Sequence, residues 1–118
     1  MDSQPPATMD TDTAAGKFWA LGQPLRLAVL RALIRAGHGG MTAGEIAALH
    51  GTRPNTLSTH LATLSAAGLI LAQREGRNIR YSMDADGIRA LLSYLLDDCC
   101  AGDPDLCAPA ALARSRQP

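Results

Sequence analysis

Three cysteines lie close together near the end of the chain, and they are the only cysteines in its 118 residues. They are Cys99, Cys100 and Cys107. Thiolates are preferred ligands of soft metal ions, and clustered thiols can also form a disulfide that works as a redox switch. Because an odd number of cysteines does not suit a framework of structural disulfides, the cluster predicts reduced thiols with a chemical role.

A long helix is expected to carry the first two of these cysteines. Its apolar positions recur every three or four residues from Ile88 to Cys99, and Gly102 is expected to end it. Neighbouring side chains on a regular helix point about 100° apart, which does not suit a shared ligand, but the last turn can unwind at Gly102. The six residues between the second and third cysteines can bring the third thiol back. A site within one chain is therefore favoured, and a site across two chains remains open.

Charge is unevenly distributed along the chain, although eleven basic and eleven acidic side chains cancel overall. Between residues 50 and 82, four arginines stand against Glu75 alone. Residues 83–118 carry six aspartates against three arginines, which restores the balance. A polyanion responds to the charge within a Debye length of roughly 10 Å, so the basic middle third permits a nucleic-acid partner despite the neutral total.

Length and composition indicate one globular domain. Apolar residues make up 47% of the chain and aromatic residues only 3%, so the core is expected to consist of helices packed through aliphatic side chains. No apolar run reaches the roughly 18 residues of a membrane span, and the N-terminus lacks a signal peptide, which predicts a cytoplasmic protein with no membrane partner. The expected organisation is a disordered tail over residues 1–12, a folded domain over 13–100 and a second tail over 101–118.

Three helices are predicted in the first half of the folded domain. The first is expected over residues 13–21 and the second over residues 24–36, where a proline fits the first turn and a glycine follows the last. A Thr-x-x-Glu capping box begins the third, a short helix, at Thr42. Its apolar residues Ile46 and Leu49 are predicted to face the core.

A fourth helix, expected between Pro54 and Gly68, has two different faces. Leu57, Leu61 and Leu64 recur at i, i+4 and i+7 and form an apolar stripe. The opposite face carries small polar groups, which can enter the major groove of DNA and bond to base edges and phosphates. The residues of this face are Asn55, Thr56, Thr59, His60 and Thr63.

Two strands over residues 69–74 and 78–83 are predicted to form a hairpin with a basic tip. A short helix, a glycine turn and a second helix with a small polar face are the parts of a helix-turn-helix, and the hairpin would be its wing. The predicted fold class is therefore mainly α with a β-hairpin wing. The arginines expected to contact phosphates around this unit are Arg53, Arg74, Arg77 and Arg80.

Several motifs, in this order, resemble the ArsR family of winged helix-turn-helix metal-responsive repressors. They are Leu21-Gly22-Gln23-Pro24-Leu25-Arg26-Leu27, then Ser58-Thr59-His60-Leu61, then Arg74-Glu75-Gly76-Arg77 followed by Tyr81. The resemblance covers about residues 17–100 and implies a homodimer that binds a double-stranded DNA operator without ligand and releases it when an inducer binds. It also implies that the first and last helices form the dimer interface, where apolar side chains are expected to be covered. The residues expected there are Phe18, Trp19, Leu91, Leu92 and Leu95.

The inducer expected from this resemblance depends on the cysteines. Members with an arsenical site before the recognition helix carry cysteines there, and residues 44–49 have none. Zinc-sensing members use carboxylates and histidines on the last helix, and this last helix has no histidine. The cluster of Cys99, Cys100 and Cys107 resembles a subset that binds trivalent arsenic at the end of that helix. Trivalent arsenic or antimony, including organoarsenicals, is therefore the expected inducer.

Four aspartates lie close to the cysteines in the sequence and favour a metalloid over a divalent metal as the ligand. They are Asp97, Asp98, Asp103 and Asp105. Arsenite leaves a neutral tris-thiolate, whereas zinc, cadmium or lead with three thiolates would leave a negative centre beside these acids. A carboxylate could complete a zinc or cadmium site, so a sensor of zinc, cadmium or lead remains an alternative. A redox or reactive-sulfur sensor is another, although acidic surroundings do not promote thiolates.

An enzyme or a metal carrier is the remaining class of function. The sequence has no Cys-x-x-Cys motif, no histidine paired with a nucleophile and no phosphate loop. It therefore predicts neither an enzyme nor a catalytic cofactor.

Overall fold

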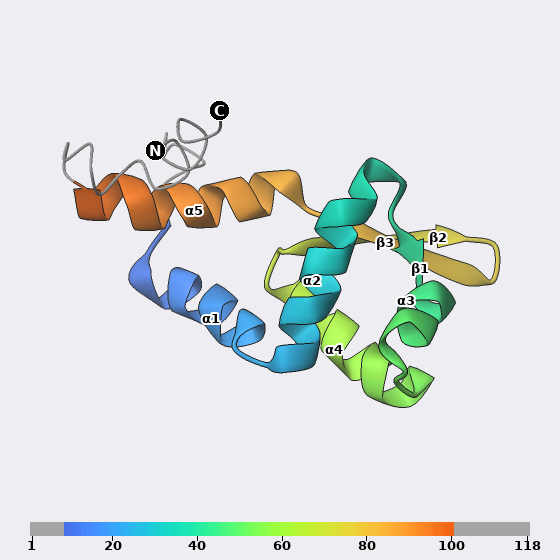
Figure 1. Cartoon of the computed structure of the whole chain (residues 1–118). Coiled ribbons are helices and arrows are strands. Elements are labelled where there is room, and N and C mark those ends of the chain that lie inside the picture. Colours follow the sequence, from blue (N-terminus) through green and yellow to red (C-terminus); the bar gives the residue numbers. More distant parts are fainter. Residues whose placement is uncertain (1–8, 101–118) are drawn as a thin grey trace, which may run out of the picture.

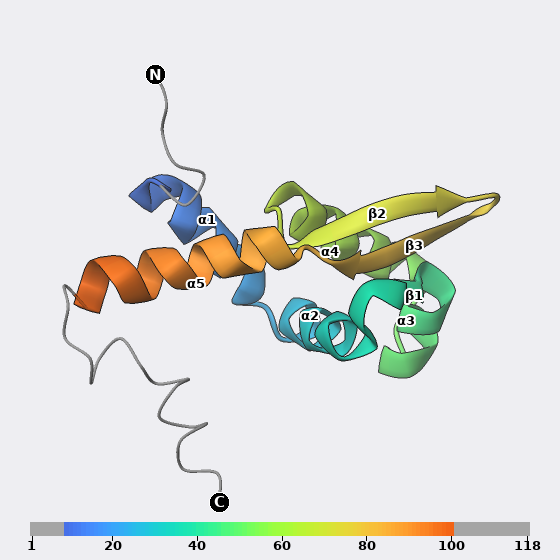
Figure 2. The same cartoon turned by 90° about the horizontal axis from the view of Figure 1, so that it is seen from above.

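Five α-helices and a three-stranded sheet make up residues 9–100, the part of the chain that the computed structural model describes; for residues 97–100 it describes the main chain only. Both predicted tails, over 1–12 and 101–118, fall largely outside this range. In chain order the elements are α1 (Thr11–Leu21), α2 (Pro24–Ala36), the 3-10 helix η1 (Gly37–Gly39), β1 (Met41–Thr42), α3 (Ala43–His50), α4 (Pro54–Ala66), β2 (Ile70–Glu75), β3 (Asn78–Met83) and α5 (Ala85–Cys100) (Figure 1). In the top view α5 and the hairpin of β2 and β3 project in opposite directions (Figure 2).

The helix α1 begins at Thr11, two residues before the predicted boundary of the folded domain. Asp10 explains the earlier start, because its carboxylate accepts the backbone N–H of Thr13 at 2.7 Å and caps the helix. Hydrogen bonding by Thr13, through its side chain and its backbone N–H, lowers the pKa of the Asp10 carboxyl.

The predicted starts of α2 and α3 are confirmed. Pro24 occupies the first turn of α2, where it has no N–H to leave unpaired. Thr42 and Glu45 form the full capping box of α3: the Thr42 hydroxyl accepts the Glu45 N–H at 3.2 Å, and the Glu45 carboxylate accepts the Thr42 N–H at 2.8 Å.

The predicted hairpin is confirmed as an antiparallel pair, and a third strand joins it. β2 extends to Glu75, which leaves a two-residue turn at Gly76 and Arg77, with Gly76 in the left-handed region at φ 62°. β1 pairs with the other edge of β3, so the strand order is β1-β3-β2. A strand of two residues, Met41–Thr42, is too short to show an alternation of polar and apolar residues, so it was not predicted.

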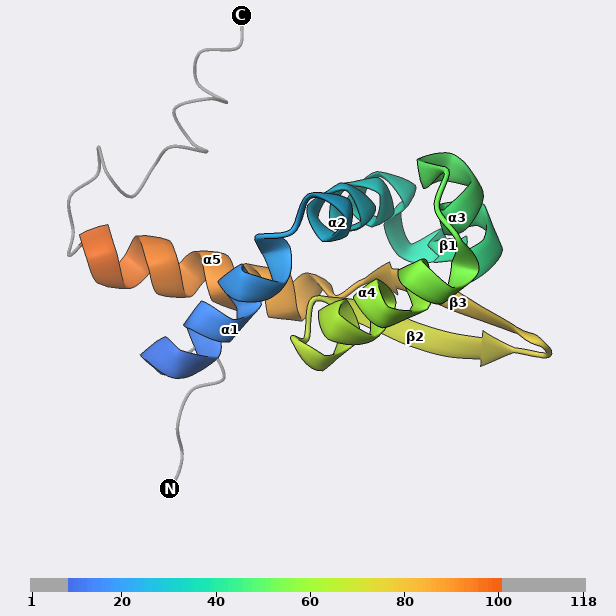
Figure 3. The same cartoon turned by 90° about the horizontal axis from the view of Figure 1, so that it is seen from below.

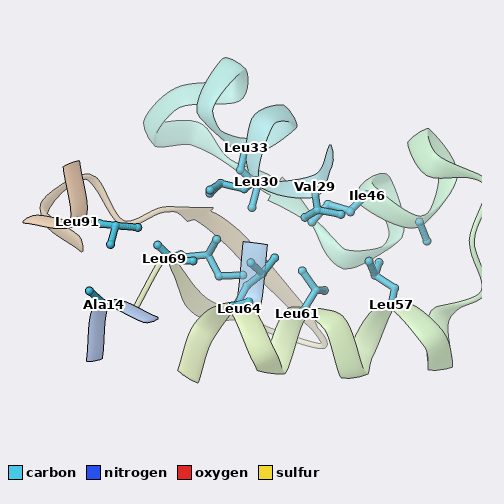
Figure 4. Packing of buried hydrophobic residues seen from close by; sticks show 13 residues of the cluster. Ala14, Val29, Leu30, Leu33, Ile46, Leu57, Leu61, Leu64, Leu69 and Leu91 are labelled. Carbon is cyan, nitrogen blue, oxygen red and sulfur yellow. The ribbon is translucent and has the colours of Figure 1, made fainter. Parts of the chain in front are cut away.

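The core lies mainly between α2, α3 and α4, and side chains from α1, the start of β2 and α5 extend it (Figure 4). Leu57, Leu61 and Leu64 are buried and point from α4 toward the other two helices, as predicted. Ile46 is buried as well, but the prediction that Leu49 faces the core is wrong, because 60% of its surface is exposed. α3 is turned so that Ile46 and its neighbour Ala47 contact the core, which leaves Leu49 on the outside.

The start of α5 packs directly on the turn between α4 and β2. The carboxylate of Asp84 accepts the N–H of Gly87 at 3.0 Å and caps the helix. A Cβ atom at Gly87 would lie 1.9 Å from the carbonyl oxygen of Gly68 in that turn. No side chain fits at Gly87 unless α5 moves away from the end of α4.

Gly87→Ala should therefore destabilise the protein by about 1–3 kcal/mol, the usual cost of overpacking. Urea denaturation at a fixed protein concentration measures the change. Gly16→Ala is the matched control, since Gly16 also lies within a helix, but an added Cβ there would meet no atom of another described element within 4 Å. Alanine there should preserve the stability or raise it by up to about 1 kcal/mol. Equal stability of Gly87→Ala and the wild type would contradict the close packing of α5 on this turn.

Candidate nucleic-acid interface

A tight turn joins α3 to α4 and gives the helix-turn-helix its shape. Gly51 adopts the left-handed conformation, with φ 60°, and closes α3. Arg53 lies at the N-cap of α4, and Pro54 occupies its first turn. Seen from below, α4 lies in front of the strands, on the side of the molecule away from α5 (Figure 3). The leucine stripe of α4 holds the helix in place, and its opposite side is available for a ligand.

Three residues of the predicted contact face are exposed together on α4. They are Asn55, Thr56 and Thr59. Thr63 is half-buried, and its hydroxyl donates to the carbonyl oxygen of Thr59 at 3.1 Å. The exposed face is therefore concentrated in the first half of α4.

His60 lies at the edge of this face rather than at its centre. Its side chain is half-buried, and its Nδ1 atom lies 3.1 Å from Nη1 of Arg26 on α2. His60 thus joins α4 to α2 through one edge of its ring.

Ser58 is an exposed residue of α4 that was not among the predicted contacts. It lines a cavity of about 260 Å³ between α4 and the hairpin, together with Leu57, Arg77 and Tyr81. Its position three residues after Asn55, and so on a neighbouring part of the helix surface, was the signal that could have identified it.

The four predicted arginines divide into three exposed residues and one that braces the hairpin. Arg53, Arg74 and Arg77 are exposed. Arg80 is half-buried: its Nε atom lies 3.1 Å from Glu75 Oε1, and its Nη1 atom donates to the carbonyl oxygen of Gly39 at 3.1 Å. The middle of the hairpin is therefore tied to the short 3-10 helix before β1, and the exposed cations lie nearer the tip of the hairpin and at the start of α4.

The predicted interface residues of α1 and α5 do not all face outward. Trp19 is 67% exposed and Leu92 50%, and Phe18 and Leu95 are also exposed. Leu91 is only 3% exposed and packs in the core of its own chain, so it offers no surface to a partner. α5 rests on its own chain through Leu91 and Ile88, which turns the rest of the apolar stripe outward.

α1 and α5 are joined to each other and to the end of α4. The hydroxyl groups of Thr11 and Tyr94 lie 2.9 Å apart and connect the two helices. The amine of Lys17 on α1 donates to the carbonyl oxygen of Ala67, immediately after α4. The two helices therefore form a frame that contacts the C-terminal end of α4.

The predicted thiol site lies outside the described side chains. The main chain of α5 runs through Cys99 and Cys100, whose side chains are not part of the description, and Cys107 lies beyond it. Among the residues that are described, no three His, Cys, Asp or Glu side chains are grouped so that they could hold a metal ion.

Residues 21–72 match the helix-turn-helix domain family. The chain is 33% identical over 89 residues to the HTH-type transcriptional regulator YgaV of Escherichia coli strain K12, a match that covers 75% of this chain and 88% of that protein. It is 34% identical over 92 residues to the probable mercury resistance operon repressor of Streptomyces lividans, with 78% of this chain and 70% of that protein covered.

Two solved structures have the same fold. An ArsR-like transcriptional regulator from Rhodococcus sp. RHA1 is 25% identical, with a TM-score of 0.67, over 86% of this chain and 93% of its own. A homodimeric winged helix-turn-helix DNA-binding domain from Mycobacterium bovis, described as a possible ArsR-family regulator, is 28% identical, with a TM-score of 0.59, over 74% of this chain and 80% of its own. The chain belongs to the ArsR family of transcriptional repressors.

Membership of the ArsR family confirms two predictions from the sequence. The fold is a mainly helical winged helix-turn-helix with a hairpin wing. ArsR relatives are transcriptional regulators and not enzymes. Within residues 9–100, no helix is long and apolar enough to cross a bilayer.

Proposed function

We propose that this ArsR-family protein binds a double-stranded DNA operator through α4 and the wing. The observation that carries the proposal is the exposed polar face of α4, with Asn55, Thr56 and Thr59, beside a hairpin whose Arg74 and Arg77 are exposed. Small side chains allow the helix to approach base edges in the major groove. The arginines supply positive charge that attracts the phosphates of the DNA backbone.

Arg77→Ala should weaken binding to the operator and to unrelated DNA by similar factors, because Arg77 is expected to contact a phosphate. It should also reduce the slope of log affinity against log salt concentration by about one unit. Fluorescence anisotropy over a series of salt concentrations measures both effects. Arg89→Ala is the matched control, since it removes the same charge from α5, away from α4 and the wing. Arg89 is exposed, and its Nη1 atom lies 3.1 Å from Asp86 Oδ1. If both variants bind like the wild type, the hairpin is not a phosphate-binding wing.

The repressor is proposed to act as a homodimer assembled through α1 and α5. Phe18, Trp19, Leu92 and Leu95 leave apolar surface exposed on these two helices. Exposed apolar surface of this kind is typical of a protein interface. The Mycobacterium bovis domain with the same fold is described as homodimeric, which supports a homodimer.

Trivalent arsenic or antimony, bound by Cys99, Cys100 and Cys107, is the proposed inducer. Three thiols match the three sulfur ligands that these soft metalloids prefer. The Streptomyces lividans relative is described as a repressor of mercury resistance, and mercury is another ion that binds thiolates. A sensor of zinc, cadmium or lead, or a redox sensor, would use the same cysteines, but it would release the operator on addition of the divalent metal or of an oxidant.

A structural change at the end of α5 could be transmitted to α4 through a small number of contacts. Thr11 and Tyr94 join α5 to α1, and Lys17 joins α1 to the end of α4. The start of α5 also rests on Gly68, in the turn after α4. For release, the inducer must bind the DNA-free form more tightly than the DNA-bound form, and a coupling of about 1–3 kcal/mol corresponds to roughly 5–150-fold.

A further inference from the structure

Arg26 is a buried cation whose partners among the described residues include no carboxylate. It is 8% exposed, its Nε atom donates to the carbonyl oxygen of Ala20 at 2.6 Å, and its Nη2 atom lies 3.5 Å from the carbonyl oxygen of Trp19. Its guanidinium also lies over the Trp19 ring, 5.0 Å from the ring centre. Both carbonyl groups belong to the last turn of α1, where the helix dipole places partial negative charge. The end of α1 therefore balances the charge and fixes the position of the guanidinium.

The contact of Arg26 with His60 determines which ring nitrogen of His60 carries the proton. Nη1 of Arg26 lies 3.1 Å from Nδ1 of His60. A guanidinium has only donors, so Nδ1 must be the acceptor and must lack a proton. In the neutral ring the proton is then on Nε2. Arg26 thus selects one of the two tautomers of His60.

The other edge of the His60 ring is available for a ligand. Nε2 of His60 has no hydrogen-bond partner among the described residues. It is accessible to solvent, because among those residues the buried side-chain nitrogen without a partner belongs to His50. On the helix, His60 lies one turn from both Thr56 and Thr63, so the residue borders the exposed face of α4.

We propose that Arg26 holds His60 in the tautomer with its proton on Nε2, so that His60 acts as a hydrogen-bond donor toward the operator. The proposal rests on the DNA binding proposed above. A donor at this position pairs with acceptors such as N7 or O6 of guanine, N7 of adenine, O4 of thymine or a phosphate oxygen, and it rejects the amino groups of cytosine and adenine. Arg26 is then a positioning residue, and His60 contributes to the choice of operator sequence.

Nitrogen NMR of the free protein tests the tautomer without any DNA. Long-range proton–nitrogen spectra at about pH 8.5, where an imidazole is neutral, distinguish a protonated from an unprotonated ring nitrogen. His60, assigned by the signals lost in His60→Gln, should show a single tautomer with its proton on Nε2. Exposed His38 in the same spectrum is the control and should show averaged tautomers. In Arg26→Met, His60 should become averaged as well. A proton on Nδ1 of His60 in the wild type, or averaging like that of His38, would overturn the proposal.

Modified operator duplexes test the donor role and identify its acceptor. Single 7-deazapurines remove one N7 acceptor each, single 2-aminopurines in place of guanine remove O6, single 5-methyl-2-pyrimidinones in place of thymine remove O4, and single methylphosphonates remove the charge of one phosphate. At one position in each half-site, a modification should weaken wild-type binding by about tenfold and leave His60→Leu unaffected. A base analogue at that position identifies a base, and a methylphosphonate identifies a phosphate. If every modification affects the wild type and His60→Leu equally, the donor role is wrong. Failure of the wild type to prefer any sequence would instead contradict the proposed function, and the NMR result would be unaffected.

Discussion

Serine in place of Cys99 or of Cys100 should leave operator affinity unchanged and abolish the release of the operator by arsenite. Each substitution leaves two thiols for an element that binds three, so the site should lose most of its affinity. Anisotropy of a labelled operator, titrated with arsenite under reducing conditions, measures release. Unchanged operator affinity of each variant in the same assay is the control for folding.

Of the three serine substitutions, Cys107→Ser should have the weakest effect on the release of the operator by arsenicals. Two thiols can still bind an organoarsenical that brings its own carbon ligand, so phenylarsine oxide should release this variant while arsenite does not. Should Cys99→Ser and Cys100→Ser both respond to arsenite like the parent protein, the inducer binds elsewhere and the proposed role of the cysteines is wrong.

Leu92→Glu should convert the dimer to a monomer at micromolar concentration. Because Leu92 is 50% exposed in the single chain, a glutamate there is hydrated in the monomer and costs little in folding. In a dimer formed through α5, each subunit would bury an unpaired carboxylate, which costs several kcal/mol per charge. Sedimentation velocity measures the change, and operator affinity should fall with it because one subunit reads only one half-site.

Leu49→Glu is the matched control for the dimer. Leu49 is 60% exposed on α3, outside the proposed interface, so its glutamate variant should remain a dimer. A monomer in the unmodified protein, or a stable dimer in both Leu92→Glu and Leu95→Glu, would contradict assembly through this face of α5.

Local signals in the sequence were sufficient to predict most of the fold. The capping box at Thr42, the proline at the start of α2 and the glycine after α3 each act through neighbouring residues, so no tertiary information was needed. The leucine stripe of α4 was also predicted correctly, because three leucines at helical spacing have one plausible orientation in a small domain.

The orientation of α3 and α5 depended on contacts that the sequence does not reveal. Leu49 lies in a helix of eight residues, too short for its periodicity to fix which flank faces the core. On α5 the apolar stripe is wider than one contact surface, and the position of the helix decides that Leu91 is buried and Leu92 exposed.

The candidate site was predicted in composition but not in detail. Arg80 was expected to act like the other hairpin arginines, whereas Glu75 and the carbonyl group of Gly39 hold it. Arg26 lay within the motif that resembles the ArsR family, yet its link to His60 joins residues 34 positions apart and required the packing of α2 against α4.

Titration of the wild-type protein–operator complex with different metals and metalloids tests the central claim most directly. A labelled operator, selected from random duplexes, should show high anisotropy with the reduced protein and return to the value of free DNA on addition of arsenite or antimonite. Zinc, cadmium and lead at the same concentrations should leave the complex intact. Release by zinc, cadmium or lead but not by arsenite, or release by an oxidant alone, would contradict the claim that this ArsR-family repressor responds to trivalent arsenic.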